Sequence, residues 1–314
     1  MAEKLICVVG PTACGKTRLG VLLAQKYNGE VISCDSMQIY RGMTIGTAAP
    51  TPEETEGIPH HLLAVADPAE SWSAARYVSA ATPVVEDILA RGKRPVLVGG
   101  TGLWLDALLR GHDFAPGMAG GAVRTELEAR LAQDGIDPLL EELRRVDPAS
   151  AEKLHPADEK RILRALEVFH ETGRTISAHN AAERALPPRF EAVKIGLRFA
   201  DRADMKDLID RRVDAMVEAG LLDEVRALLN RGLPRSATAM QAIGYKEFAG
   251  VLAGEKTERE AVEEVKLCSR QYAKRQLTWL RRDPGIRWIE WEKNRDFVRA
   301  MQISTEILSE EGLF

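Results

Sequence analysis

Residues 10–17 read Gly10-Pro11-Thr12-Ala13-Cys14-Gly15-Lys16-Thr17. This run fits the pattern G-x-x-x-x-G-K-[ST] of a phosphate-binding loop, or P-loop. The glycines let the backbone turn so that successive N–H groups point at an anion, and the following helix adds partial positive charge. Lys16 then reaches the outer phosphate, and the Thr17 hydroxyl can hold Mg²⁺. We therefore expect this loop to bind a diphosphate or a triphosphate.

The residues on either side of the loop support this interpretation. Residues 5–9 form a short apolar run typical of a buried strand in a parallel sheet. Residues 18–27 place Leu19, Leu22 and Leu23 at helical spacing. An ordinary Gly-rich turn is the alternative, but strand, loop and helix in this order are the context that a P-loop needs.

The composition is that of a soluble globular protein, since 45% of the 314 residues are hydrophobic and 29% are charged. No apolar run approaches the length of a membrane span, and the N-terminus lacks the pattern of a signal peptide. We expect a cytoplasmic monomer without membrane contact. No C-x-x-C spacing occurs, which predicts reduced thiols and no zinc site for Cys7, Cys14, Cys34 and Cys268.

Two further strand ends carry side chains with chemistry. Residues 30–34 read as a second strand that runs into Asp35, and residues 94–98 as a third strand that runs into Gly99-Gly100-Thr101-Gly102. Ligands of open α/β sheets bind at the carboxyl ends of the strands, which makes Asp35 and Thr101 candidate site residues. By its position alone, Asp35 fits a helix N-cap or turn residue equally well.

The remaining pattern predicts a helical insertion in an α/β core. Residues 41–70 hold many Gly and Pro and predict a long loop over the site, with His60 and His61 as structural residues. A helix over 73–90, interrupted or kinked near Pro83, follows. After a linker at 115–121, helical patterns cover 123–133, 137–146 and 160–171, and strand-like sequence resumes at 192–197. Further helices are predicted over 201–229, 246–252 and 258–280, and a last strand over 286–289.

We therefore predict a P-loop-type, mostly parallel sheet flanked by helices, with an all-helical insertion domain. The predicted boundaries are 1–113 for the first part of the core, 114–190 for the insertion and 191–314 for the second part of the core.

Residues 269–282 contain no acidic residue and form a basic segment of the helix predicted over 258–280 and its end. The basic residues are Arg270, Lys274, Arg275, Arg281 and Arg282. Arg270, Lys274 and Arg281 share one helical face, and Tyr272, Gln276 and Trp279 can stack or form hydrogen bonds nearby. This pattern alone fits a patch for a polyanion and an ordinary solvated face equally well.

Seven sequence blocks, taken in order, resemble the bacterial tRNA dimethylallyltransferases, also called tRNA isopentenyltransferases. They are residues 10–17, Asp35-Ser36-Met37-Gln38-Ile39-Tyr40, Gly46-Thr47-Ala48, Val98-Gly99-Gly100-Thr101-Gly102-Leu103, Arg164-Ala165-Leu166-Glu167-Val168, Ile243-Gly244-Tyr245-Lys246-Glu247 and Lys274-Arg275-Gln276-Leu277-Thr278-Trp279. This chain departs from the usual pattern at Cys14, Trp104 and Leu208, where relatives carry Ser, Tyr and, in some, Arg.

The resemblance implies transfer of a dimethylallyl group from dimethylallyl diphosphate to N6 of adenosine 37, in tRNAs reading codons that begin with U. It implies Asp35 as the general base and Thr101 as a hydrogen-bonding partner near the amine. Lys16, the loop N–H groups, Mg²⁺ on Thr17 and an arginine from the helix predicted over 201–229 would meet the diphosphate. For this arginine the resemblance favours Arg212 over Arg211.

By the same resemblance, the flipped base and the anticodon stem-loop meet four groups of residues, with the insertion gripping the stem. They are Asp35, Ser36, Met37 and Gln38; Glu159, Lys160, Arg161, Ile162 and Leu163; Ala242, Ile243, Gly244, Tyr245, Lys246 and Glu247; and Arg270, Lys274 and Arg275 of the basic segment.

Three other functions compete with this one. An adenylate dimethylallyltransferase would act on a free nucleotide, but such an acceptor needs neither the insertion nor the basic helix. A P-loop kinase of a small metabolite would bind ATP, but no hydrophobic strand ends in the Asp that a standard NTPase uses. A non-catalytic RNA-binding module is the third.

Overall fold

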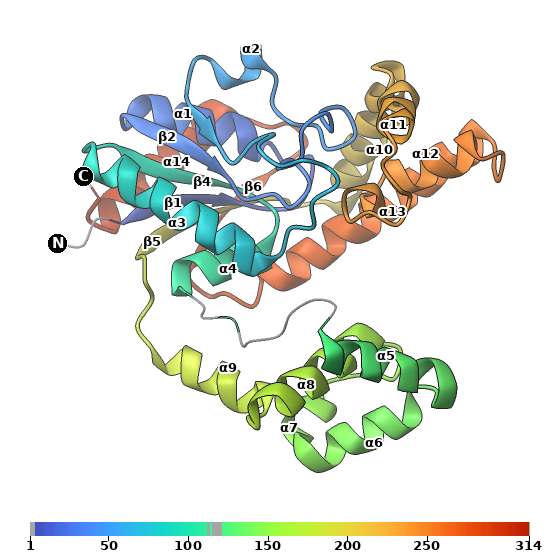
Figure 1. Cartoon of the computed structure of the whole chain (residues 1–314). Helices are drawn as coiled ribbons and strands as arrows, with labels where there is room; N and C mark the ends of the chain where they lie inside the picture. Colours follow the sequence, from blue (N-terminus) through green and yellow to red (C-terminus); the bar gives the residue numbers. More distant parts are fainter. Residues whose placement is uncertain (1–3, 112–113, 115–120, 314) are drawn as a thin grey trace. The chain divides into compact units, whose positions relative to one another are not determined.

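The computed structural model describes residues 4–111, 114 and 121–313. The chain folds into two compact units, shown in Figure 1. The core unit lies within Met1–Gly111 and Arg189–Phe314, and the insertion unit lies within His112–Pro188. Most of the linker predicted at 115–121 falls outside the described residues.

The described part of the core unit contains a six-stranded sheet with the order β3-β2-β4-β1-β5-β6, and every pairing in it is parallel. The strands are β1 (Leu5–Val9), β2 (Gly29–Ser33), β3 (His60–His61), β4 (Arg94–Gly99), β5 (Ala192–Phe199) and β6 (Ile286–Trp291). All residues of β1 are buried, as expected for a central strand of a parallel sheet. The predicted fold class is confirmed.

Helices cover both faces of this sheet (Figure 1). Alternate residues of β1, such as Ile6 and Val8, pack in a cluster with Leu19 of α1 (Lys16–Lys26) and Ile307 of α14 (Phe297–Glu310). The helices α3 (Ala74–Ala90) and α4 (Gly102–Arg110) pack together. The other described helices of the core unit are α2 (Pro52–Thr55), α10 (Arg202–Glu218), α11 (Leu221–Asn230), α12 (Tyr245–Leu252) and α13 (Glu258–Leu280).

Several elements of the core unit differ from the sequence prediction. The helix expected over 201–229 is two helices, because Gly220 takes a left-handed backbone conformation with φ 97°. Pro83 does not interrupt α3. Proline has no N–H to donate to the Ser79 carbonyl, but both residues are exposed, so water can reach that carbonyl. The loop expected over 41–70 contributes β3, which pairs with Val31 and Ile32 of β2. Helix α14 was not predicted, although Asp296 caps it by accepting from the Arg299 N–H.

The insertion unit is helical throughout its described elements. They are α5 (Ala122–Asp134), α6 (Asp137–Val146), α7 (Pro148–Ala151), α8 (Glu159–Thr172) and α9 (Ile176–Ala185). Its core contains Leu127, Leu143 and Leu166, one from each of α5, α6 and α8. The buried Asp147 side chain accepts from the Ser150 and Ser177 N–H groups, near the starts of the short helices α7 and α9.

No helix in the described ranges combines the length and the apolar character that a membrane crossing requires.

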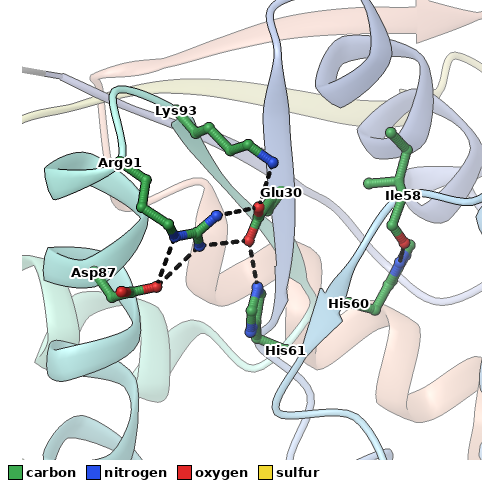
Figure 2. Close-up of polar contacts among 7 residues, drawn as sticks. All are labelled: Glu30, Ile58, His60, His61, Asp87, Arg91 and Lys93. Atoms are coloured by element: carbon green, nitrogen blue, oxygen red, sulfur yellow. Dashed lines mark hydrogen bonds and ion pairs between the residues drawn. The ribbon is translucent and has the colours of Figure 1, made fainter.

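A buried carboxylate fastens the edge of the core sheet (Figure 2). Glu30 of β2 binds Arg91 through both guanidinium ends, at 2.5 and 2.8 Å, and Lys93 at 2.7 Å. His61 of β3 meets the same carboxylate at 2.7 Å, and His60 instead meets the Ile58 carbonyl at 2.8 Å. Both histidines thus have the structural contacts that the sequence suggested. The Arg91, Lys93 and His61 contacts outweigh burial and hold the pKa of Glu30 far below its usual range.

We expect Glu30→Gln to lower the free energy of unfolding by about 2 kcal/mol at pH 7, because the charge-assisted hydrogen bonds between the buried carboxylate and the partly exposed Arg91 and Lys93 are weakened or lost. Since the folded-state pKa is lowered, this stabilisation exists above the unfolded pKa of about 4.3 and fades as the pH falls below it. Urea denaturation of wild type and variant at pH 7 and pH 3.5 measures the loss of stability and its dependence on pH. The control Glu310→Gln breaks an exposed pair with Arg287 and should change stability by less than about 1 kcal/mol. Equal effects of the two variants at pH 7 would contradict this account.

Candidate active site

The P-loop connects β1 to α1 and presents a helix N-terminus. Gly15 precedes α1 in a left-handed conformation, with φ 89°, which favours glycine. No side chain caps the helix and its first turn holds no acidic residue, so its N–H groups are available for an anion. The Lys16 ammonium folds back and donates to the Pro11 carbonyl at 2.8 Å. The loop thus has the arrangement needed to bind phosphate oxygens.

Three side chains distant in sequence brace the P-loop. Gln276 of α13 accepts from the Thr12 N–H at 2.9 Å and donates to the Gly100 carbonyl at 3.0 Å. The Trp291 indole donates to the Cys14 carbonyl at 2.8 Å, and Arg295 donates to the Ala13 carbonyl at 3.4 Å. Gln276 therefore ties the P-loop to the Gly-rich end of β4, a role that its place in the basic segment did not suggest. Nothing in the local sequence marks Trp291 or Arg295, because only the fold brings them to the loop.

Asp35 and Thr101 meet at the ends of neighbouring strands. Asp35 Oδ1 accepts from the Met37 N–H at 2.9 Å and the Gln38 N–H at 3.4 Å, which makes a tight turn after β2. Thr101 Oγ1, just after β4, accepts from the Ser36 N–H at 3.1 Å. Since the sheet order is β2-β4-β1, both residues lie at the same edge as the P-loop. Asp35 is thus both a turn residue and a carboxylate at the ligand-binding edge.

Helix α13 passes along this edge and adds Tyr272. Burial and the negative charge of Asp35 raise the pKa of Tyr272 to about 12, against the opposite effect of hydrogen bonds with Thr101 and Gln276. Further along α13, the Trp279 indole donates to Asp106 at 3.0 Å. A side chain on Gly102 would strike the Trp279 ring at 2.2 Å, so only glycine allows this close approach. Gln276 is therefore used to join the P-loop to the end of β4, and the indole N–H of Trp279 is used to bind Asp106.

The two arginines of α10 face different surroundings. Arg211 is exposed, and its Nε donates to the Asp207 carbonyl within the same helix. Arg212 is half-buried, and its buried Nε has no hydrogen-bond partner among the described residues. Burial lowers the pKa of Arg212, and the nearby negative charge of Asp35 opposes that effect. A half-buried guanidinium whose buried Nε is unused, close to Cys14 of the P-loop, fits an anionic ligand.

The site also fits Mg²⁺ bound together with a phosphate ligand. Among the described residues, no group of three or more His, Cys, Asp or Glu side chains is placed to hold a metal ion. Mg²⁺ needs no such cage, because it keeps several waters and binds through one or two protein oxygens plus phosphate oxygens. The Thr17 hydroxyl, at the start of α1, can supply one protein oxygen.

The residues predicted to contact tRNA differ in accessibility. Glu159, Lys160, Arg161, Lys246, Lys274 and Arg275 are exposed. Ser36, Met37, Gln38 and Ile243 are half-buried, whereas Ile162, Leu163, Ala242, Gly244, Tyr245 and Glu247 are buried. Arg270 pairs with Asp210 of α10, which distinguishes it from its neighbours on α13. The exposed cations of this set in the core unit are thus Lys246, Lys274 and Arg275, with Arg275 over the Tyr272 ring.

Comparisons with known proteins agree with this arrangement. The family described as IPP transferase matches residues 38–283, and the family described as isopentenyl transferase matches residues 3–67. A tRNA dimethylallyltransferase of Halalkalibacterium halodurans is 46% identical over 92% of both chains. One of Carboxydothermus hydrogenoformans is 43% identical over 100% of this chain and 99% of its own.

Solved structures give the same result. A tRNA isopentenylpyrophosphate transferase from Bacillus halodurans superposes with a TM-score of 0.74 at 43% identity, covering 98% of this chain and 96% of its own. A eukaryotic dimethylallyltransferase acting on tRNA superposes with a TM-score of 0.84 at 31% identity, covering 98% of this chain and 80% of its own. The P-loop, the two strand-end residues and these matches along almost the whole sequence lead to one conclusion: the chain belongs to the tRNA dimethylallyltransferase family.

Proposed function

We propose that this protein transfers the dimethylallyl group of dimethylallyl diphosphate to N6 of adenosine 37, in tRNAs reading codons that begin with U. Diphosphate is released. The observation that carries the proposal is the meeting of the P-loop, Asp35 and Thr101 at one sheet edge, with Arg212 close by. An anion site beside a carboxylate suits a leaving diphosphate and an amine that must lose a proton. Because tRNA is the acceptor, we expect the reaction in the cytoplasm.

The chemistry follows from these groups. The adenine N6 attacks the allylic carbon, an N–C bond forms, and the C–O bond to diphosphate breaks. N6 sheds a proton in this step, and Asp35 at the end of β2 is the acceptor that we assign. Because Asp35 engages the turn through Oδ1, its second oxygen is the one that we assign to the amine. Thr101, fixed by the Ser36 N–H, orients the amine.

Negative charge grows on the diphosphate as the bond breaks. We assign Lys16, the N–H groups at the start of α1 and Arg212 to that charge, because fixed donors of this kind stabilise the transition state more than the ground state. Mg²⁺ on Thr17 would supply further positive charge to the leaving group.

The tRNA contacts remain part of this proposal. The target base must leave its stack to reach the sheet edge, which flipping out of the anticodon loop achieves. Lys246, Lys274 and Arg275 are exposed on the core unit and suit the phosphates around the flipped base. In the insertion unit Glu159, Lys160 and Arg161 start α8 on its exposed side, and we assign this surface to the anticodon stem.

Diphosphate release with different acceptors tests the function. With dimethylallyl diphosphate, we expect stoichiometric diphosphate release with an anticodon stem-loop bearing adenosine 37, and none with a stem-loop bearing guanosine there. Robust turnover with AMP and none with the stem-loop would instead identify a free-nucleotide enzyme. Tight ATP binding by calorimetry, without binding of dimethylallyl diphosphate, would identify a kinase.

We expect Lys274→Ala with Arg275→Ala to weaken tRNA binding and to flatten its salt dependence, because each lost phosphate contact lowers the slope of log K against log salt by about 0.7 to 0.9. Filter binding from low to high salt measures the slope. Arg270→Ala on the same helix is the comparison variant: because its guanidinium is paired with Asp210, we expect it to change the salt slope less than the loss of Lys274 and Arg275 does. A salt slope in the double variant equal to that of wild type would count against a phosphate-contacting helix.

A further inference from the structure

The carboxylate of Glu224 gathers an unusual set of donors outside the groups already assigned. Glu224 lies in the first turns of α11, and its Oε2 accepts from the Thr44 N–H at 2.8 Å, the Thr44 hydroxyl at 2.9 Å and the Ile45 N–H at 2.9 Å. Its Oε1 accepts from the Gly46 N–H at 3.0 Å and the Tyr245 hydroxyl at 2.5 Å. One side chain thus holds three successive backbone N–H groups, much as a bound anion would.

These bonds join two segments that are far apart in the sequence. The first is the loop of residues 44–48, and the second is the start of α12 at Tyr245. Tyr245 is fully buried, and its ring lies so close to Gly46 that a side chain there would strike it at 2.5 Å. Burial and the adjacent Glu224 charge raise the pKa of Tyr245, which keeps its hydroxyl a proton donor to the carboxylate.

The loop held in this way fixes the turn that carries Asp35. The Gln38 side-chain amide donates to the Thr47 carbonyl at 3.2 Å and to the Ala48 carbonyl at 3.1 Å. The Gln38 backbone N–H in turn donates to Asp35 Oδ1. A continuous series of hydrogen bonds and short chain segments therefore runs from Glu224 through the 44–48 loop and Gln38 to Asp35.

The P-loop is held by side chains from other elements. Gln276, Trp291 and Arg295 brace it, and within the described part of the chain the hydrogen bonds of Glu224 go to residues 44–46 and Tyr245, not to residues 10–17. Loss of the Glu224 bonds should therefore disturb the acceptor side of the site and leave the diphosphate side in place.

We propose that Glu224 is a positioning residue for the acceptor nucleotide: by holding the 44–48 loop against Tyr245 it sets the Asp35–Gln38 turn that receives the base. This inference rests on the proposed function and assigns to Glu224 a part in tRNA recognition. The isosteric substitution Glu224→Gln replaces one acceptor oxygen by an NH₂ group. This group would face N–H or O–H donors of the loop or Tyr245 and cannot accept hydrogen bonds from them.

The test is a comparison of KM values. Glu224→Gln should raise the KM for the anticodon stem-loop by about 10-fold or more, since hydrogen bonds to a charged acceptor are lost. The KM for dimethylallyl diphosphate should stay within about 2-fold because the P-loop is untouched. Glu310→Gln on α14 is the matched control and should change neither constant. Amide hydrogen exchange over residues 44–48 should become faster in Glu224→Gln only.

Tyr245→Phe is the second variant, because it removes one donor and keeps the backbone bonds. We expect a smaller shift of the same kind, about 3-fold in the KM for the stem-loop. If Glu224→Gln does not fold, the Tyr245→Phe result decides. Equal rises in both KM values, or unchanged kinetics in a folded variant, would overturn the positioning role. Wild type without any transfer to the stem-loop would overturn the proposed function instead, so the two failures are distinct.

Discussion

Asp35→Asn should lower the single-turnover rate of transfer by about 10²- to 10⁴-fold, the usual contribution of a general base. The substitution keeps the shape of the side chain and its Oδ1 acceptor, so the bonds from the Met37 and Gln38 N–H groups persist. It removes only the basicity of the second oxygen. The turn after β2 and the packing around it should therefore remain intact.

Binding separates this explanation from a loss of structure. We expect the Kd for the anticodon stem-loop and the unfolding midpoint of Asp35→Asn to stay within about 3-fold and about 2 °C of wild type, as for a surface substitution. Rapid-quench kinetics at saturating substrates measure the rate, and filter binding measures the Kd. Turnover equal to wild type would remove Asp35 as the base, and a parallel loss of binding would make its role structural.

Arg212→Gln should lower kcat/KM for dimethylallyl diphosphate by about 10²- to 10³-fold, the effect of removing one fixed donor at a site of developing charge. The adjacent Arg211→Gln is a closely matched control, because it removes the same charge from the same helix. Arg211 is exposed and bonded within α10, whereas the Arg212 Nε is buried and unpaired.

A comparison of Arg211→Gln with Arg212→Gln separates the effect of side-chain position from the effect of net charge. Steady-state kinetics with varied dimethylallyl diphosphate should show Arg211→Gln within about 2-fold of wild type. Inhibition by added diphosphate should weaken in Arg212→Gln, because the same cation meets the product. Equal losses in both variants would mean that the net charge of α10, and not the position of the Arg212 guanidinium, determines the rate.

The sequence was sufficient for the features that are local in the chain. The P-loop and the ends of β2 and β4 each follow a short apolar run, and the parallel topology alone puts them at one edge. Helix α13 has the bounds that its sequence pattern predicted, and in the structure Thr257 and Glu260 form a capping box at its start. Helical spacing does not reveal a break at a single glycine, which is why α10 and α11 were read as one helix.

Contacts between distant segments were beyond the sequence. Residue 276 lies in a basic run, yet its amide turns inward to Thr12 and Gly100. In the sequence Arg270 is as basic as Lys274 and Arg275, but its partner Asp210 lies opposite it only when α10 packs on α13. Glu224 looks like an ordinary acidic residue in the first turn of a helix, and its partners at 44–46 lie far away in the chain. A sequence pattern shows which residues are charged and how they are spaced, but it does not show which distant residue will contact them after folding.

The most direct test of the account is mass spectrometry of nucleosides from a tRNA reading a codon that begins with U, incubated with this protein, dimethylallyl diphosphate and Mg²⁺. The account predicts one added dimethylallyl group on adenosine 37, one diphosphate released for each group, and no product with Asp35→Asn on the same time scale. An unmodified tRNA with active, folded protein, or modification at another nucleotide, would contradict it.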